Sequence, residues 1–359
     1  MSYLKLAYEP YTLYFKFDAG TSRGIMRERK VWFLHLASPD NPDVVGKGEV
    51  APLEGLSVDD IPNMDAILQD LCEKVAETDF NFADLHTWVN KLVPPTLPAV
   101  RFGLETAAHD WANGGKGIIW HKDFAKGKQR ITTNGLIWMG SPDFMQSQIE
   151  EKLQKGYKCL KLKIGALDFE QELAILRHIR ARYKADEITL RVDANGAFLP
   201  IDALEKLKRL SEFDIHSIEQ PIKAGQIDEM ARLCALSPLP IALDEELIGV
   251  YDIAQQQKLL EIIKPDYVIM KPSLLGGILS CVTLWRHLKD LGIQWWMTSA
   301  LESNIGLNAI CQLTAFLFEL EQQKGGTNLL PQGLGTGGLY HNNIPSALCM
   351  EGEDIFCTL

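Results

Sequence analysis

The feature that most constrains this chain of 359 residues is a repeated alternation of short apolar segments with amphipathic helical segments, starting near residue 131. Short apolar segments are typical of buried strands, and many strand–helix repeats are typical of a parallel sheet covered by helices. We predict strands over 131–137, 160–164, 188–193, 217–219, 241–244, 267–271, 293–299 and 328–330. The first seven are each followed by a predicted helix, over 144–154, 169–183, 201–210, 227–234, 250–260, 278–288 and 305–320.

Eight strands favour a closed (β/α) barrel over an open doubly wound sheet. No GxGxxG sequence follows the first of these strands, which counts against a dinucleotide-binding open sheet.

The first 125 residues have a different pattern. Alternating residues predict strands over 11–17, 31–36 and 46–53, and helical spacing follows over 58–93 and 99–113. The sequence therefore predicts two domains: an N-terminal α+β domain over 1–125 and a modified TIM barrel over 126–339. We expect the C-terminal tail, 340–359, to join the N-terminal domain.

Composition excludes several classes of function. A net charge of −11 argues against nucleic acid or an anionic membrane as a partner. No apolar run reaches the roughly 18 residues of a membrane span, and the first residues lack a signal-peptide pattern, so the cytoplasm is the expected location. The seven cysteines form no CxxC pair and are interpreted as small core residues.

Charged residues end five of the predicted strands, each directly after a bulky apolar residue: Lys163, Asp193, Glu219, Asp244 and Lys271. The carboxyl ends of parallel strands meet at one face of a barrel, where charged residues are typical of catalysis. Taken singly, each has a structural explanation, such as a turn for Asp193, a helix cap for Asp244 or a solvated lysine. The occurrence of five such residues at matching strand ends favours the functional interpretation.

The chemistry of such a cluster is specific. Three carboxylates that converge in a barrel mouth repel one another and need a counter-ion, and an all-oxygen site suits Mg²⁺. Lys163 and Lys271 would flank the metal, and a lysine beside a divalent cation has a lowered pKa and can act as a base. The metal would stabilise an enediolate formed when a proton next to a carboxylate is removed.

These residues resemble the enolase superfamily in its muconate-lactonizing-enzyme subgroup. The resemblance is carried by Lys161-Leu162-Lys163, Val192-Asp193-Ala194-Asn195, Ile218-Glu219-Gln220-Pro221, Leu243-Asp244-Glu245 and Met270-Lys271-Pro272, with Gly48-Glu49 and Arg101-Phe102-Gly103-Leu104-Glu105 in the first domain. It implies a capping domain over the barrel, Mg²⁺ on Asp193, Glu219 and Asp244 with Mn²⁺ as a substitute, and acid–base lysines at 163 and 271.

Within the superfamily, residues 133–137, 299–306 and 333–337 resemble the o-succinylbenzoate synthases of menaquinone biosynthesis. That resemblance implies a small carboxylate substrate, dehydrated to an aromatic acid. It further implies that Lys163 removes and returns the proton, that Lys271 stabilises charge, that Lys161 supports Lys163, and that Ser299 contacts the succinyl tail. The capping-domain segment 20–29, rich in Gly and Arg, is expected to set specificity.

Some alternatives stay open. The same site could catalyse N-acylamino acid racemisation or dipeptide epimerisation, although Gly335-Thr336-Gly337 lacks the Asp-x-Asp typical of dipeptide epimerases. A non-catalytic binding barrel is disfavoured by the complete set of charged strand ends. Glu246 stands where the family often has Ser, which leaves Glu245 as an alternative carboxylate near the metal. His35, His109, His178 and His216 are interpreted as structural.

Overall fold

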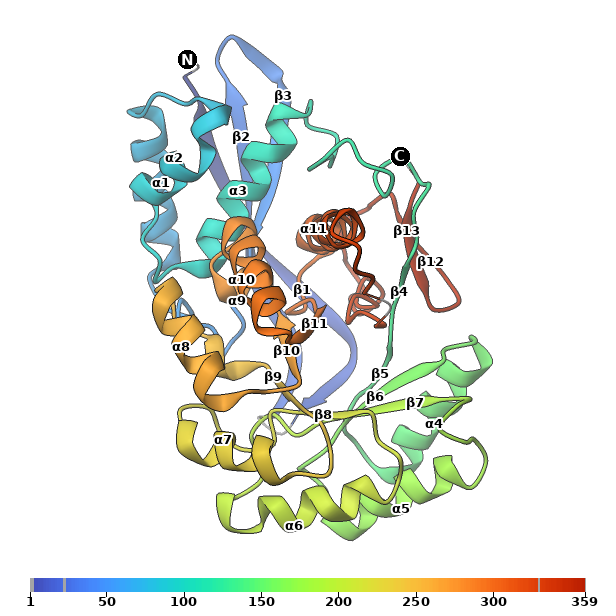
Figure 1. Cartoon of the computed structure of the whole chain (residues 1–359). Helices are drawn as coiled ribbons and strands as arrows, with labels where there is room; N and C mark the ends of the chain where they lie inside the picture. The colour runs from blue at the N-terminus through green and yellow to red at the C-terminus, as the bar shows by residue number, and fades with distance from the viewer. Residues whose placement is uncertain (1–2, 22–23, 329, 359) are drawn as a thin grey trace.

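The computed structural model describes residues 3–21, 24–328 and 330–358. Its N-terminal domain is an antiparallel sheet of three strands in the order β1-β2-β3, covered by helices (Figure 1). The elements are β1 (Lys5–Thr21), β2 (Gly24–Ser38), β3 (Asn41–Val50), α1 (Met64–Ala76), η1 (Phe82–Asp84), α2 (Leu85–Leu92) and α3 (Pro98–Ala112). The predicted helical stretch 58–93 is thus three separate helical elements.

Two glycines let α3 lie directly against β3. A Cβ atom on Gly48 would be 1.9 Å from the carbonyl oxygen of Gly103, and one on Gly46 would be 2.1 Å from that of Ala107. Any larger residue at these positions would push the helix off the sheet. The close approach holds α3 between the sheet and the second domain.

The second domain is a parallel sheet of seven strands in the order β11-β10-β9-β8-β7-β6-β5. Its strands are β5 (Gly135–Ile137), β6 (Cys159–Lys163), β7 (Thr189–Asp193), β8 (Ser217–Glu219), β9 (Ile241–Leu243), β10 (Tyr267–Met270) and β11 (Gln294–Met297). The connecting helices are α4 (Pro142–Gln154), α5 (Phe169–Arg180), α6 (Pro200–Ser211), α7 (Ile227–Leu236), η2 (Glu245–Leu247), α8 (Ile253–Ile263), α9 (Pro272–Leu275), α10 (Ile278–Leu291) and α11 (Asn304–Gln323). Strand order follows chain order throughout, as the predicted barrel requires.

The gap between the first and last barrel strands is bridged by a short segment near residue 332. Gln332 forms a parallel bridge with Thr133, and Gly333 forms one with Thr298. This segment takes the place of the predicted eighth strand, 328–330, whose residue 329 lies outside the described part of the chain. Closure by two bridges brings the start and end of the domain together.

The prediction of one strand over 131–137 is wrong. The segment is divided into β4 (Ile131–Thr132) and β5, which belong to different sheets. β4 pairs with the C-terminal hairpin of β12 (Leu348–Glu351) and β13 (Asp354–Cys357). The N–H of Thr133 still donates to the carbonyl of Glu353 in the hairpin, whereas that of Asn134 donates to the carbonyl of Gln332 in the barrel, so the chain changes sheets between these two residues.

The C-terminal tail therefore contacts both domains. Its first residues lie along β1: Tyr340 bridges Phe15, and the side chain of Asn342 bonds to the backbone of Thr12 and Tyr14. Its last residues form the hairpin beside β4 (Figure 1).

Among the described residues, four apolar clusters account for the packing, of which the smallest is formed by Ala242, Ile269 and Trp296 on β9, β10 and β11. One lies between the barrel strands and their helices, and one lies between the N-terminal sheet and α1–α3. A third joins the domains, with Leu13 and Phe15 of β1 against Trp138, Leu301 and Tyr340. The N-terminal domain thus packs on the barrel face where the strands end.

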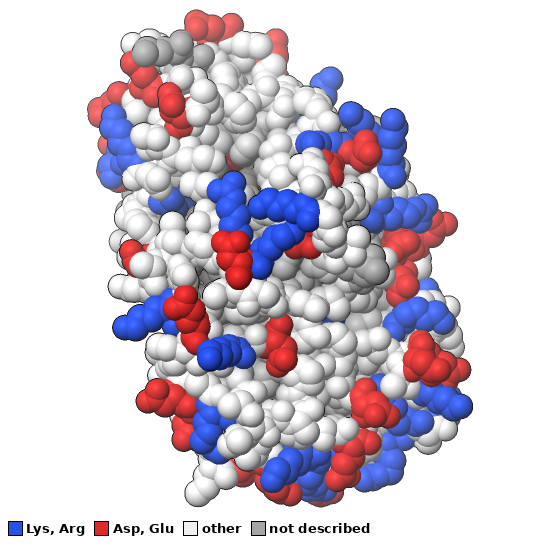
Figure 2. All heavy atoms as spheres, in the orientation of Figure 1, with Lys and Arg blue, Asp and Glu red and all other residues white. Residues whose placement is uncertain are grey.

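The surface is of mixed charge. Figure 2 shows acidic and basic side chains interspersed over the visible face. Among the described residues, no helix combines the length and apolar character needed to cross a bilayer.

Candidate active site

The charged residues predicted at strand ends lie side by side in the sheet. Lys163 on β6 is the register partner of Asp193 on β7, which is in turn the partner of Glu219 on β8. Asp244 and Lys271 directly follow β9 and β10. All five side chains are buried, as is Lys161. The structure therefore brings together the six residues that the sequence singled out for the centre of the site.

Ammonium groups contact the carboxylates directly. The Lys161 Nζ lies 2.8 Å from Asp193 Oδ2 and 2.5 Å from Glu219 Oε2, so it bridges the two acids. Lys163 Nζ donates to the same Asp193 oxygen at 2.5 Å. Lys271 Nζ donates to Asp244 Oδ2. Three lysines and three acids thus contact one another within one buried cluster.

The surroundings of the three lysines shift their pKa values in different directions. Burial lowers the pKa of Lys163, and the attraction of Asp193 only partly offsets this effect. Burial also opposes the charge on Lys161 and Lys271, but their carboxylate neighbours outweigh it and raise both pKa values. Lys163 is therefore the lysine best able to exchange a proton, while Lys161 and Lys271 remain cationic.

The pKa values of two of the acids are also shifted in opposite directions. Burial and the adjacent Asp193 raise the pKa of Glu219 to about 8. For Asp193 itself, burial is outweighed by Lys161 and Lys163, which hold its pKa well below the usual range.

One polar neighbour of Lys163 carries no predicted role. Asn195 lies in the left-handed backbone region, with φ of +45°, and its Oδ1 accepts a hydrogen bond from Lys163 Nζ at 2.8 Å. Its Nδ2 donates to Glu245 Oε1 at 3.2 Å. The side chain therefore ties Lys163 to the loop after β9. Its place two residues after Asp193 was the signal in the sequence.

The two glutamates after Asp244 have different contacts. Glu245 bonds to Asn195, at the edge of the site. Glu246 points away: its oxygens accept from Gln220 Nε2 at 3.2 Å and from the backbone of Gly225 at 3.0 Å. Gln220 Oε1 accepts from the backbone of Asp244 and Glu245, both at 3.2 Å. Glu246 thus holds the amide that supports the loop carrying Asp244.

The donor set suits a hard divalent cation. Asp193, Glu219 and Asp244 are buried carboxylates from three consecutive strands. Neither oxygen of Glu219 accepts a hydrogen bond of good geometry from the described residues, despite the short ion pair with Lys161. Buried carboxylate oxygens without such bonds are costly, and a hard cation would satisfy them. Among the described residues, no three or more acids, histidines or cysteines have the mutual geometry of a metal site. The ammonium groups of the three lysines lie against the carboxylate oxygens of Asp193, Glu219 and Asp244.

A cavity of about 70 Å³ opens onto these lysines. Lys161, Lys163 and Lys271 line one side of it, and capping-domain residues Thr21 and Met26 line another. These two belong to the predicted specificity segment 20–29, of which residues 22 and 23 lie outside the described part of the chain. The cavity therefore lies between the charged strand ends and the capping domain.

The remaining wall comes from the loops after β11 and after the bridging segment. Ser299, Ala300 and Leu301 line it together with Thr336. The hydroxyls of Ser299 and Thr336 are 2.8 Å apart, and Ser299 Oγ also accepts from the backbone of Leu301 at 3.0 Å. Ser299 thus lines the cavity, and its contact with a substrate stays a prediction.

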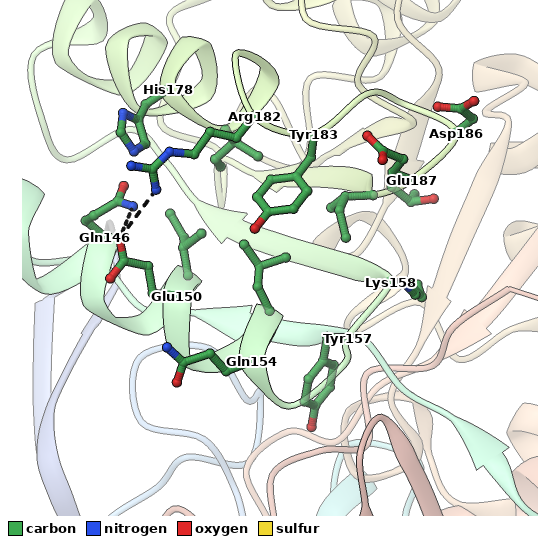
Figure 3. Close-up of a pocket in the computed structure, with 15 residues that line it drawn as sticks. Gln146, Glu150, Gln154, Tyr157, Lys158, His178, Arg182, Tyr183, Asp186 and Glu187 are labelled. Atoms are coloured by element: carbon green, nitrogen blue, oxygen red, sulfur yellow. Dashed lines mark hydrogen bonds and ion pairs between the residues drawn. The ribbon is translucent and has the colours of Figure 1, made fainter.

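A larger hollow, of about 690 Å³, lies elsewhere, between α4 and α5 (Figure 3). Two of its labelled charged side chains, Glu150 and Arg182, form an ion pair with each other. It contains none of the charged strand ends. Size alone therefore does not mark the reactive site, and the convergent charges do.

The comparisons with known proteins agree with this geometry. The family described as Enolase C-terminal domain-like matches residues 145–331, more than half of the chain. The o-succinylbenzoate synthase of Desulfotalea psychrophila is 44% identical over 376 aligned positions that cover 98% of each chain.

Solved structures give the same result. The crystal structure of MenC from Desulfotalea psychrophila has a TM-score of 0.87 at 41% identity, covering 99% of this chain and all of that one. A dipeptide epimerase from Enterococcus faecalis, complexed with Mg and a dipeptide, has a TM-score of 0.84 at 19% identity, covering 100% of this chain and 98% of that one. The latter likeness shows the fold alone.

Proposed function

Because the chain belongs to the enolase superfamily, we propose that it is an o-succinylbenzoate synthase, which dehydrates 2-succinyl-6-hydroxy-2,4-cyclohexadiene-1-carboxylate in menaquinone biosynthesis. The observation that carries this proposal is the nearly full-length relative named an o-succinylbenzoate synthase, at 44% identity. The geometry is compatible with it, because Lys163 and Lys271 both line the cavity, bonded to Asp193 and Asp244 respectively, and offer one group for proton transfer and one for charge stabilisation.

In the proposed reaction, neutral Lys163 removes the proton from the carbon that bears the carboxylate. The electrons of that C–H bond move into the carboxylate to form an enediolate. When they return, the C–O bond to the neighbouring hydroxyl breaks, the ring becomes aromatic, and the ammonium of Lys163 returns the proton to the departing hydroxide as water. Both proton transfers are on one face, so a single lysine suffices.

The other residues hold charge in place. Lys161, bound to Asp193 and Glu219, stays an ammonium and disfavours a second positive charge on Lys163. Lys271, bound to Asp244, places a fixed positive charge at the cavity wall. A Mg²⁺ ion held by Asp193, Glu219 and Asp244 would supply positive charge for the two oxygens of the substrate carboxylate.

Racemisation of an N-acyl amino acid would require Lys163 and Lys271 to exchange protons on opposite faces. The relatives named as epimerases or racemases are more distant from this chain, at 24% and 28% identity, and Gly335-Thr336-Gly337 lacks the Asp-x-Asp typical of dipeptide epimerases. A direct assay tests the proposal: the cyclohexadiene substrate is compared with a panel of N-succinyl amino acids and dipeptides at equal concentration. We expect a kcat/KM at least about a hundredfold higher for dehydration, and a higher value for any racemisation or epimerisation would refute the assignment.

A further inference from the structure

The loop that joins β11 to α11, Ser299–Ser303, forms one wall of the cavity and has a strained backbone. Leu301 has φ of +66°, a region that bulky side chains rarely adopt. The loop is buried, and Ser299, Ala300 and Leu301 line the cavity. Strain of this kind persists only where surrounding groups impose it, and it is common at ligand-binding sites. The groups that impose it are therefore of functional interest.

Two buried charged residues of the capping domain bond to this loop. The Arg29 guanidinium on β2 donates through Nη1 to the carbonyl of Ala300 and through Nη2 to that of Ala51. Glu49 on β3 accepts from the backbone of Ser303 at 2.7 Å, from the Ser303 hydroxyl at 2.6 Å and from the backbone of Gly306 at 2.8 Å. Arg29 thus holds the start of the loop, and Glu49 holds its end and the first turn of α11.

The two residues act from outside the barrel. Glu49 has no exposed surface and is 254 residues from Ser303 in the chain. Its three bonds satisfy donors at the start of α11 that have no partner within the helix. The hydroxyl of Tyr340 adds a further bond to the carbonyl of Leu301, at 2.6 Å. The conformation of the loop is therefore set by the docking of the capping domain.

We propose that Arg29 and Glu49 are positioning residues, which hold the strained loop Ser299–Ser303 in the conformation that receives the part of the substrate remote from the reacting carbon. The proposal rests on the proposed function for the identity of that substrate, but the effect of Arg29 and Glu49 on the conformation of the loop does not depend on it. Neither residue lines the cavity, so both act through Ala300, Leu301 and Ser303.

The test uses the full-length protein with Glu49→Gln. The amide keeps the shape of the side chain but loses an acceptor oxygen and presents an NH₂ group to donors. We expect amide hydrogen exchange in the peptide covering 299–306 to become at least about tenfold faster. KM for the cyclohexadiene substrate should rise about tenfold while kcat changes less than threefold, the pattern of lost uniform binding.

The chain offers a matched control. Glu105 on α3 is also a buried capping-domain acid, and it accepts from the backbone of Ile278 at the start of α10. Glu105→Gln is therefore the same chemical change at the same domain interface, directed at a different loop. We expect it to speed exchange near 276–282 and to leave exchange in 299–306 unchanged.

Arg29→Met approaches the loop from its other end and should reproduce the exchange and KM effects of Glu49→Gln. Unchanged exchange in 299–306 in both variants, or a loss confined to kcat, would overturn the proposal. A wild-type protein without activity on the cyclohexadiene would refute the proposed function alone, because exchange is measured without substrate.

Discussion

Replacing Lys163 by alanine tests the central chemical assignment. No neighbouring lysine can take over as base. Lys161 lies within 2.8 Å of Asp193 and 2.5 Å of Glu219, and these acids raise its pKa. Lys271 is bonded to Asp244, and its pKa is also raised. The variant therefore loses the full contribution of a general base.

General-base catalysis contributes about 10²- to 10⁴-fold, or roughly 3–5 kcal/mol of activation free energy. Because both proton transfers use Lys163, we expect kcat to fall by at least about 10³-fold, near the upper end of that range. Asp193 keeps Lys161 as a partner, so the fold should survive. The substitution removes none of the three carboxylates, so Mg²⁺ should bind no more weakly.

The assay follows the absorbance of the aromatic product, with calorimetric titration of Mg²⁺ and near-ultraviolet circular dichroism on the same samples. Lys163→Arg is the matched control, because it keeps the positive charge but cannot act as a base at neutral pH. We expect it to be as inactive as the alanine variant. An alanine variant within tenfold of wild type, or an arginine variant with more than a tenth of wild-type activity, would refute the role of Lys163 as base.

Three further predictions concern charge. Lys271→Ala should lower kcat about 10²- to 10³-fold because it removes a fixed cation, whereas Lys271→Arg keeps the charge and should keep most activity. If a steady-state assay shows equal losses of kcat in the two variants, Lys271 takes part in proton transfer. Chelation by EDTA should abolish activity, and Mg²⁺ should restore it; activity that persists after dialysis against EDTA would contradict a metal on Asp193, Glu219 and Asp244. Burial lowers the pKa of His109 to about 4, below its unfolded value of 6.5, so its contribution to stability is present above pH 6.5 and is lost as the pH falls. Because of this group, denaturant titrations should give a free energy of unfolding about 2 kcal/mol lower at pH 5 than at pH 7. The variant His109→Phe keeps a ring packed against Phe82 and Trp120 and should lose this pH-dependent difference. The same pH dependence in the variant and the wild type would contradict the prediction.

Local pattern was enough to place the charged centre of the site. Asp193 and Glu219 each end a short apolar strand, and a parallel sheet must bring such ends together, so their proximity follows from chain order alone. The same reasoning failed at 131–137. The seven residues Ile131 to Ile137 look like one strand in the sequence, and only the pairing of β4 with the C-terminal hairpin divides them.

What the tertiary structure decided is how the site is held. The amide of Asn195 joins Lys163 to Glu245, three residues that are separate in the sequence. The contrast between Lys163 and Lys271 depends on which carboxylates and ammonium groups lie within a few ångströms of each. The contact of Glu49 with Ser303 joins segments 254 residues apart. The sequence determined the residue types and their order along the strands, because hydrophobic periodicity is local; the partners of each buried charge depend on the docking of two domains, which no local pattern records.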